Sequence, residues 1–281
     1  MQYLRNFCFF MAMLLAVQVG IVFAEGNSYS EATTKLIQFL ENKSNGQAEI
    51  RVKDEIKIPE SDFYFVLIDF KAGQDEKELS FVTNGKYITN ALIELESGQN
   101  LAQYYETISK TVDIEVSEDE IYFGNPETAK VKIVIFSDFE CPYCKNLSNG
   151  LSTFFDEHKD DIVIYYKHYP LSFHKNAQLL SKIYEAGKKM GYYWNMYQYD
   201  YTNKTYEEIT SIFEQKLKEG EIGQFYKTLN SPEITQKIEK NIKQGQEIGV
   251  NGTPYMLVNG HPISGYQPEL IKNLISDELG K

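Results

Sequence analysis

The chain has 281 residues and a formal net charge of −12, from 28 basic and 40 acidic residues. This length fits one large domain or two ordinary ones. Because an acidic chain repels phosphate backbones and anionic membrane surfaces, its charge argues against nucleic acid as a partner.

Residues 1–24 are typical of a signal peptide. Arg5 supplies a positive start, residues 7–19 are mostly apolar, and Ala24 is a small residue where a signal peptidase would cleave. The alternative is a transmembrane anchor, but the apolar stretch is short for a span of about 20 residues and carries Gln18 near its end. We therefore expect an exported, soluble protein, periplasmic or secreted, whose mature chain begins near Glu25.

Residues 25–115 are predicted to form a small α+β domain. A helix is expected over 28–42, where Ser28-Tyr29-Ser30-Glu31 can form a capping box. Aromatic and β-branched residues predict three strands, at 63–70, 79–83 and 87–95. Asn84-Gly85 is a strong hairpin signal between the last two strands, because both residues tolerate positive φ. A connecting helix over 100–110 ends this domain.

Residues 122–281 are predicted to form a second domain, and the charged, turn-rich passage from the acidic run at 115–120 to Gly124-Asn125-Pro126 marks the boundary. An apolar run at 131–136 predicts a buried strand, and a helix followed by a strand at 162–166 completes a β-α-β unit with a right-handed crossover. The pattern from 173 to 249 is helical and forms an insertion. Short strands at 255–258 and 262–264 and a helix at 267–279 close an α/β domain.

Two of the three cysteines stand in Cys141-Pro142-Tyr143-Cys144, and the third, Cys8, lies in the predicted leader. Oxidising compartments normally invite several structural disulfides in an exported protein. A disulfide that closes so short a loop removes little entropy from the unfolded chain, so stabilisation of the fold is a weak explanation for the presence of the pair. The spacing therefore favours a pair that cycles between dithiol and disulfide.

The strand and helix predicted on either side place this pair at a strand-to-helix junction. Pro142 suits the first turn of a helix, where its missing N–H loses nothing. Cys141 would then sit at the helix N-terminus, where unpaired N–H groups and the helix dipole stabilise a thiolate. A thiolate attacks disulfides, so Cys141 is the expected nucleophile. Cys144, one turn later and less exposed, is placed to resolve a mixed disulfide at Cys141.

A zinc site is the competing interpretation of two cysteines at this spacing. A structural zinc normally takes four cysteine or histidine ligands. The histidines show no ligand spacing, and each is expected in an ordinary structural role: His158, His168, His174 and His261. We expect no metal at this site.

Residues 136–144, the turn at 124–126 and Gly252-Thr253-Pro254 together resemble the DsbA-type thiol:disulfide oxidoreductases of the thioredoxin superfamily. The resemblance covers roughly residue 124 to the C-terminus and implies a thioredoxin-like fold with a helical insertion and no cofactor. It also implies that Pro254 is a cis-proline facing the cysteine pair and that Thr253 presents backbone groups to substrate peptides. The alternative for Pro254 is an ordinary trans turn proline.

Two departures from that family bear on chemistry. Many relatives have a buried carboxylate six residues before the first cysteine, where this chain has Ile135. Asp138 and Glu140 are nearer in sequence, but alternation predicts that they are solvated. Tyr143 replaces the histidine of strongly oxidising DsbA proteins, so we expect a Cys141 pKa between about 8.5 and about 3.5. The reduction potential should then be less oxidising than about −120 mV.

The expected activity is the formation or isomerisation of disulfides in other exported, cysteine-containing proteins. A membrane partner, either a quinone-linked oxidase or a reductase, would reset the pair. The hairpin at 79–95 resembles the N-terminal dimerisation domain of DsbC/DsbG-type isomerases, which implies a homodimer with two active sites facing a shared cleft. The alternative is a monomeric accessory module.

A holdase chaperone or peptide-binding module with little redox turnover is the alternative from another functional class. Its motivation is a run of aromatic residues in the predicted insertion, at Tyr192, Tyr193, Trp194, Tyr197, Tyr199 and Tyr201. Because aromatic side chains dominate core burial, these residues are expected mainly in a helical core.

Overall fold

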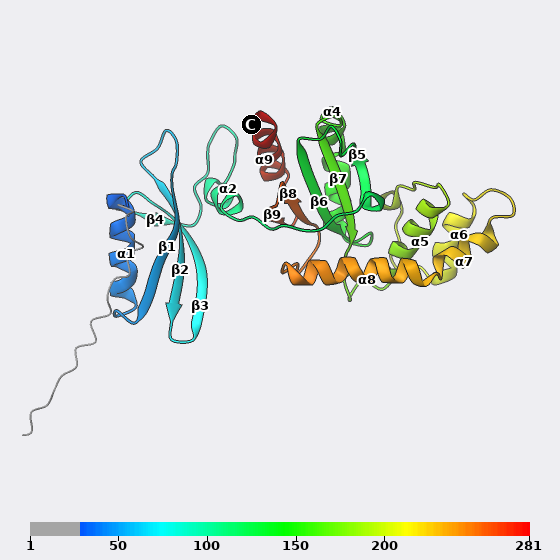
Figure 1. The fold of residues 1–281 in the computed structure, drawn as a ribbon, viewed down its shortest axis with the longest axis horizontal. Helices are drawn as coiled ribbons and strands as arrows, with labels where there is room; N and C mark the ends of the chain where they lie inside the picture. Colours follow the sequence, from blue (N-terminus) through cyan, green and yellow to red (C-terminus); the bar gives the residue numbers. More distant parts are fainter. Residues whose placement is uncertain (1–28) are drawn as a thin grey trace, which may run out of the picture. The chain divides into compact units, whose positions relative to one another are not determined.

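The structure is a computed structural model that describes residues 29–281, and the predicted signal peptide lies outside the described residues. The chain divides into two compact units, the first ending at Thr89 and the second beginning at Asn90. Each unit has its own sheet (Figure 1).

The first unit is an antiparallel sheet with one helix. The sheet order is β1-β2-β3-β4, and the elements are α1 (Glu31–Lys43), β1 (Ala48–Lys57), β2 (Tyr64–Ala72), β3 (Asp75–Thr83) and β4 (Ile88–Thr89). Leu36 of α1 packs on Val66 and Ile68 of β2, which buries one face of the sheet. The α+β character is as expected from the sequence.

Two local predictions in this unit differ from the structure. Ser30 is the N-cap of α1 and accepts from the Thr33 N–H at 3.1 Å, while its hydroxyl donates to Glu55 of β1 at 2.6 Å. The glutamate that joins this cap therefore comes from β1 and not from Glu31 of the predicted capping box. Strand β1 was not predicted, although Ile50 and Val52 alternate with charged residues such as Arg51, as in a half-buried strand. The strand expected over 87–95 shortens to β4.

Helix α2 (Leu101–Ile108) belongs to the second unit, so the domain boundary predicted near 115 lies too late. The Tyr104 hydroxyl donates to Asp277 at 2.6 Å, and the Val112 N–H donates to the carbonyl oxygen of Gly260 at 2.8 Å. Local patterns of turns and charges carry no information about contacts with partners this distant in sequence. For that reason they indicate a boundary after the helix.

The second unit is built on a five-stranded sheet of order β5-β7-β6-β8-β9. Its strands are β5 (Ile121–Gly124), β6 (Val131–Ser137), β7 (Ile162–His168), β8 (Tyr255–Val258) and β9 (His261–Ser264). β6 and β7 are parallel, and β8 is antiparallel to β6, with Phe136 opposite Tyr255. β5 was not predicted as a strand; it pairs antiparallel with β7 beside the turn at 124–126.

Helices cover the sheet on both faces. One face packs against α3 (Pro142–Gly150), α4 (Ser152–Glu157) and α9 (Pro268–Gly280). The long helix α8 (Pro232–Glu247) packs on β7 and runs beside the sheet in Figure 1. The predicted helix after Pro142 is thus two helices, which meet at Leu151.

The insertion between β7 and β8 is helical as predicted. It contains α5 (Ala177–Lys189), η2 (Met196–Gln198), α6 (Tyr206–Glu214), α7 (Ile222–Leu229) and α8. Tyr197 and Tyr201 are buried in its core, and Trp194 packs at that core's edge. Tyr193 alone among the predicted aromatic run is largely exposed, at 76%. The run is therefore mostly core, which weakens the case for a chaperone surface.

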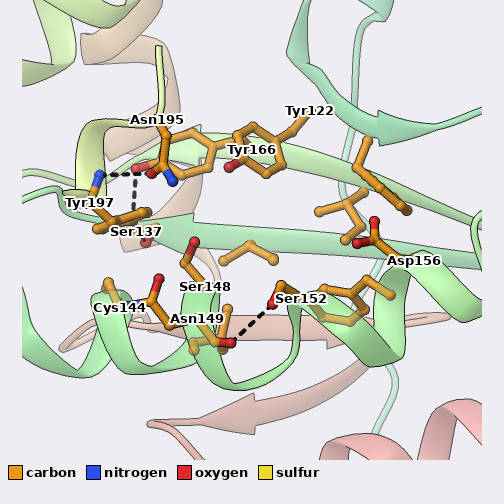
Figure 2. A pocket seen from close by; sticks show the side chains of 15 residues that line it. Tyr122, Ser137, Cys144, Ser148, Asn149, Ser152, Asp156, Tyr166, Asn195 and Tyr197 are labelled. Atoms are coloured by element: carbon orange, nitrogen blue, oxygen red, sulfur yellow. Dashed lines mark hydrogen bonds between the residues drawn. The ribbon is translucent and has the colours of Figure 1, made fainter. Parts of the chain in front are cut away.

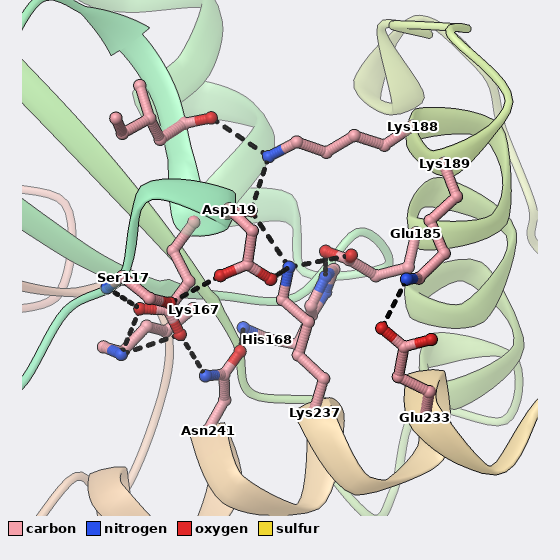
Figure 3. Close-up of polar contacts among 12 residues, drawn as sticks. Ser117, Asp119, Lys167, His168, Glu185, Lys188, Lys189, Glu233, Lys237 and Asn241 are labelled. Atoms are coloured by element: carbon pink, nitrogen blue, oxygen red, sulfur yellow. Dashed lines mark hydrogen bonds and ion pairs between the residues drawn. The ribbon is translucent and has the colours of Figure 1, made fainter.

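Buried charges tie the insertion to the sheet (Figure 3). Lys167 of β7 is fully buried and donates to both carboxylate oxygens of Glu120 at 2.8 Å, in the short helix η1 (Glu118–Glu120). Asn241 of α8 donates to the same carboxylate at 2.6 Å. Close by, Glu185 of α5 contacts His168 at 2.9 Å and Lys237 at 2.8 Å. Four elements are thus held by a connected set of charge-assisted hydrogen bonds.

Candidate active site at the start of helix α3

The cysteine pair lies where the sequence predicted it, at a strand-to-helix junction. β6 ends at Ser137, and after a short turn Cys141 is the N-cap of α3 with Pro142 in the first turn. The Cys141 N–H donates to the carbonyl oxygen of Asp138 at 3.1 Å, which closes the turn. Extended backbone at Cys141 (φ −72°, ψ 122°) presents its side chain beyond the first helical N–H groups.

Asp138 is 1% exposed, so the prediction that it is solvated is wrong. Its carboxylate accepts from the N–H groups of Glu140 and Leu171 and contacts His174 Nδ1, each at 2.8 Å. Glu140, partly buried, accepts from the Asn176 N–H at 2.5 Å. The segment 171–176 covers the turn, and nothing local in the sequence places it there. These two carboxylates hold the active-site turn against the insertion.

Both cysteines are free thiols with little exposure, 4% for Cys141 and 1% for Cys144. Tyr143 between them is 61% exposed, and Pro142 is also exposed. Cys144 faces the sheet and lines a cavity beneath α3, whereas Cys141 lines a groove on the opposite side, toward the insertion. The two thiols therefore meet different surroundings, as their expected roles require.

The two pKa values move apart. Hydrogen bonds lower the pKa of Cys141 to about 5, against burial; the largest comes from the Cys144 thiol, and backbone N–H groups of Cys144 and Tyr143 add smaller ones. This value lies within the range expected from the sequence, although the neighbouring thiol contributes more than the helix N-terminus. Burial raises the pKa of Cys144, and so does Cys141. The pair thus holds one thiolate, on Cys141.

The peptide bond between Thr253 and Pro254 is cis, and it faces the pair. When Cys141 is protonated, its thiol donates to the carbonyl oxygen of Thr253 at 3.2 Å. The Gly265 N–H donates to the carbonyl oxygen of Pro254 at 2.8 Å, which fixes this loop to the end of β9. The fold thus brings Thr253 and Pro254 to the cysteines from more than a hundred residues away.

A groove of ≈ 470 Å³ opens beside Cys141. Its lining includes Glu140, Lys145 and His174, together with Phe173, which is 76% exposed. Exposed Phe173 gives the groove apolar surface at its rim, and the buried rings of Phe139 and Tyr201 also line it. A groove of this kind can hold an extended peptide next to Cys141.

Each histidine has a partner within the fold, and residues 29–281 hold no cluster of side chains that could bind a metal ion. His158 and His261 contact backbone carbonyl oxygens at 2.8 Å, whereas His168 and His174 contact carboxylates. His174 reaches the groove beside Cys141, which its position in the sequence did not indicate.

Sequence reasoning missed two further residues beside the pair, Ser137 and Tyr197. Their hydroxyl oxygens are 2.6 Å apart, and both line the cavity behind Cys144 (Figure 2). Ser137 is the last residue of the strand before the turn, and its position close to Cys141 in the sequence could have identified it. Tyr197 lies sixty residues later in the insertion, where no spacing connects it with the cysteines.

Comparison with known proteins places this site in a defined family. The thioredoxin family model matches residues 116–277. The probable disulfide bond formation protein D of Bacillus cereus is 31% identical over 168 residues, which cover 55% of this chain and 77% of that protein. The crystal structure of oxidised BdbD from Bacillus subtilis has a TM-score of 0.51 at 18% identity, covering 61% of this chain and all of that chain. That likeness concerns the fold.

A third similarity is to part of a larger protein. The Na⁺/H⁺ antiporter NhaA of Herminiimonas arsenicoxydans is 22% identical over 169 residues, which cover 60% of this chain but 26% of the antiporter. Within residues 29–281, no helix has the length and apolar character needed to cross a membrane.

Proposed function

The chain belongs to the thioredoxin family, and from that premise we propose that it is an exported thiol:disulfide oxidoreductase that forms or isomerises disulfides in other exported proteins. The observation that carries this proposal is the opposition of the two thiols across one helical turn, with Cys141 facing a groove and Cys144 facing the sheet. The name of the Bacillus cereus relative, a probable disulfide bond formation protein, points to the same reaction.

The reaction begins when a substrate disulfide or dithiol meets Cys141. In the reductive direction the Cys141 thiolate attacks a substrate sulfur, a mixed disulfide forms, and one substrate thiolate leaves. Cys144 then attacks Cys141, which forms the Cys141–Cys144 disulfide and releases the second substrate thiol. The oxidative direction reverses these steps. A pKa of about 5 keeps Cys141 ionised at neutral pH, so of the two cysteines Cys141 is both the better nucleophile and the better leaving group.

Thr253 and Pro254 are proposed to receive the substrate. The cis bond places the Thr253 backbone beside the Cys141 thiol, so a peptide extended along the groove would pair with that backbone while its cysteine reaches Cys141. Exposed Phe173 and Tyr143 would contact the apolar side chains of an unfolded substrate.

Direction of use follows from the redox state of the pair in the cell. Rapid acid quenching followed by thiol alkylation separates the dithiol from the disulfide. A mostly oxidised pair identifies an oxidase reset by a quinone-linked membrane oxidase. A mostly reduced pair identifies an isomerase or reductase reset by a membrane reductase.

The first unit is proposed to form a homodimer, as its hairpin resembles an isomerase dimerisation domain. Light scattering on the protein from Glu25 onward should give a dimer, and on the protein from Asn90 onward a monomer, since Asn90 begins the second unit. If the protein from Glu25 onward is a monomer, the proposed homodimer is wrong. Mass spectrometry of the protein recovered from the cell exterior or periplasm tests export and should find Glu25 at the N-terminus.

A Cys141→Ser variant separates redox catalysis from a holdase activity. Oxidoreductase turnover requires the Cys141 sulfur, so the variant should lose nearly all disulfide exchange. Suppression of aggregation of a cysteine-free unfolded protein would be unaffected if the chain also acted as a holdase.

A further inference from the structure

The thiol of Cys144 must gain or lose a proton in every cycle, although it is almost fully buried. Its cavity wall includes the apolar side chains of Ile135 and Leu147, which cannot exchange protons. Burial raises the pKa of Cys144, which makes unassisted loss of its proton slow at neutral pH. A group that moves this proton must therefore lie within reach of the sulfur.

Ser137 is the polar side chain placed to do so. It lies at the end of β6 and lines the same cavity as Cys144, and a hydrogen bond from its hydroxyl acts to lower the pKa of Cys144, against burial. On its other side it shares a 2.6 Å hydrogen bond with the hydroxyl of Tyr197, in which either oxygen can donate. The Tyr166 hydroxyl lies 3.3 Å from that of Tyr197. All three hydroxyls are buried, so the contacts between them are not replaced by bulk water.

This chain of hydroxyls ends at a cavity of ≈ 290 Å³ that reaches the surface (Figure 2). Ser137, Tyr166, Tyr197 and Cys144 form its buried end. Asn149, Ser152, Asp156 and Asn195 form its outer rim and are exposed. The volume is ample for several water molecules, and the hydroxyls supply the polar partners that such waters need. Protons can therefore pass between bulk solvent and the inner hydroxyls.

We propose that Ser137 and Tyr197 form a proton relay between Cys144 and the water in this cavity. The inference rests on the proposed oxidoreductase function. When Cys144 attacks the mixed disulfide, its proton passes to Ser137 Oγ, the Ser137 proton passes to the Tyr197 oxygen, and the Tyr197 proton passes to water. The new bond joins the two cysteine sulfurs, and the bond to the substrate sulfur breaks. When Cys144 is the leaving group, the same transfers run in reverse.

Other titratable groups near Cys144 are less well placed. Asp156 of α4 is the carboxylate of the cavity lining, but it belongs to the exposed rim. Tyr122 of β5 is also at the exposed side, and Tyr166 of β7 has the longer contact with Tyr197, at 3.3 Å, and belongs to the same group of inner hydroxyls. The Asp138 carboxylate is already bound by the Glu140 N–H in the turn and by Leu171 and His174 after β7. Cys141 is the sulfur under attack and is bonded to substrate at this step.

The test measures the lifetime of a mixed disulfide between Cys141 and glutathione, by rapid alkylation and mass spectrometry. In Tyr197→Phe and in Ser137→Ala, the relay predicts a lifetime longer by on the order of 10²-fold, typical of losing a positioned proton-transfer group. In both variants, the rate at which iodoacetamide alkylates Cys141 in the reduced protein should stay within about twofold of the wild-type rate, because neither substitution changes the immediate surroundings of Cys141.

Three further variants separate the relay from a structural effect. Ser137→Thr keeps the hydroxyl and should restore a lifetime near that of the wild type. Tyr201→Phe and Ser181→Ala each remove a buried hydroxyl that bonds to a backbone carbonyl elsewhere in the insertion, and neither should change the lifetime. If Tyr197→Phe fails to fold, the comparison of Ser137→Ala with Ser137→Thr still tests the relay. These two variants differ at residue 137 alone, where threonine has a hydroxyl and alanine does not.

The relay is overturned if Ser137→Ala or a folded Tyr197→Phe resolves the mixed disulfide as fast as the two control variants. It is also overturned if Ser137→Thr is as slow as Ser137→Ala. These results leave the proposed function standing, provided that the wild type itself forms and resolves the mixed disulfide. A wild type that never forms one overturns both.

Discussion

In its thiol form, Cys141 donates a hydrogen bond to the carbonyl oxygen of Thr253 at 3.2 Å, across 112 residues of sequence. This contact joins the start of α3 to the cis-proline loop before β8. Under the proposed function, it places the reactive sulfur beside backbone that would pair with a bound peptide.

Replacing each cysteine in turn should give different products. Cys141→Ser removes the nucleophile and should abolish mixed disulfides with substrate. Cys144→Ser leaves the nucleophile without its resolving partner, so mixed disulfides at Cys141 should accumulate. Non-reducing electrophoresis with mass spectrometry measures both. Equal trapping by the two variants would contradict the assignment of roles.

The pKa of Cys141 should depend on Cys144. In the wild type, the rate of alkylation of Cys141 should rise with pH around a pKa of about 5 and be level at neutral pH. Cys144→Ala removes the largest stabilising contact, so the pKa should rise toward the free value of about 8.5 while backbone N–H groups keep it lower. Tyr143→Phe, which changes an exposed side chain, is the control and should leave the profile in place. An unchanged profile in Cys144→Ala would refute this origin of the shift.

The buried ion pair between Lys167 and Glu120 should be necessary for stability. Glu120→Gln leaves a buried lysine charge without its counterion, so the free energy of unfolding should fall by about 3–5 kcal/mol. Lys243→Ala is the matched control, because it removes one partner of an exposed pair within α8 and should cost no more than about 0.5 kcal/mol. Urea unfolding measures the free energy of unfolding of both variants. A similar loss in the two would contradict the claim that the buried pair contributes more to stability than the exposed one.

Acid should weaken the contact between the insertion and the sheet through Glu185. Burial opposes ionisation of Glu185, but His168 and Lys237 outweigh it and lower the pKa from 4.5 to about 2. Because the folded pKa is the lower one, this stabilisation is present above about pH 4.5 and is lost as pH falls toward 2. Glu185→Gln should be less stable at neutral pH and show a flatter decline in unfolding free energy between these pH values. A decline as steep as that of the wild type would contradict the assignment.

Much of the second unit was accessible from its sequence. The apolar run before Cys141, the position of Pro142 and the order of motifs predicted the strand, the helix and the approach of Pro254, since these depend on local patterns and on the resemblance. The helical insertion was predicted with its aromatic core. Strand β1 was not predicted although Ile50 and Val52 alternate with charged residues, which is the pattern of a half-buried strand. Helix α2 was assigned to the wrong unit because the partner of its Tyr104 lies far along the chain, at Asp277.

The surroundings of the cysteines were harder to predict. Asp138 follows a buried strand and reads as a turn residue, yet Leu171 and His174 enclose it. Tyr197 reaches the cavity behind Cys144 from the insertion, as one of many tyrosines there. In both cases the deciding neighbour is distant in sequence, and no periodicity or short motif records which distant side chain completes a site.

The most direct test mixes the purified protein, with Cys141 and Cys144 joined by a disulfide, with one equivalent of a reduced peptide that has two cysteines. Mass spectrometry after alkylation follows both partners. The account predicts that the peptide becomes oxidised while the two thiols appear at Cys141 and Cys144, in matching amounts. A peptide that stays reduced beside an unchanged Cys141–Cys144 disulfide, with no mixed disulfide trapped in Cys144→Ser, would contradict it.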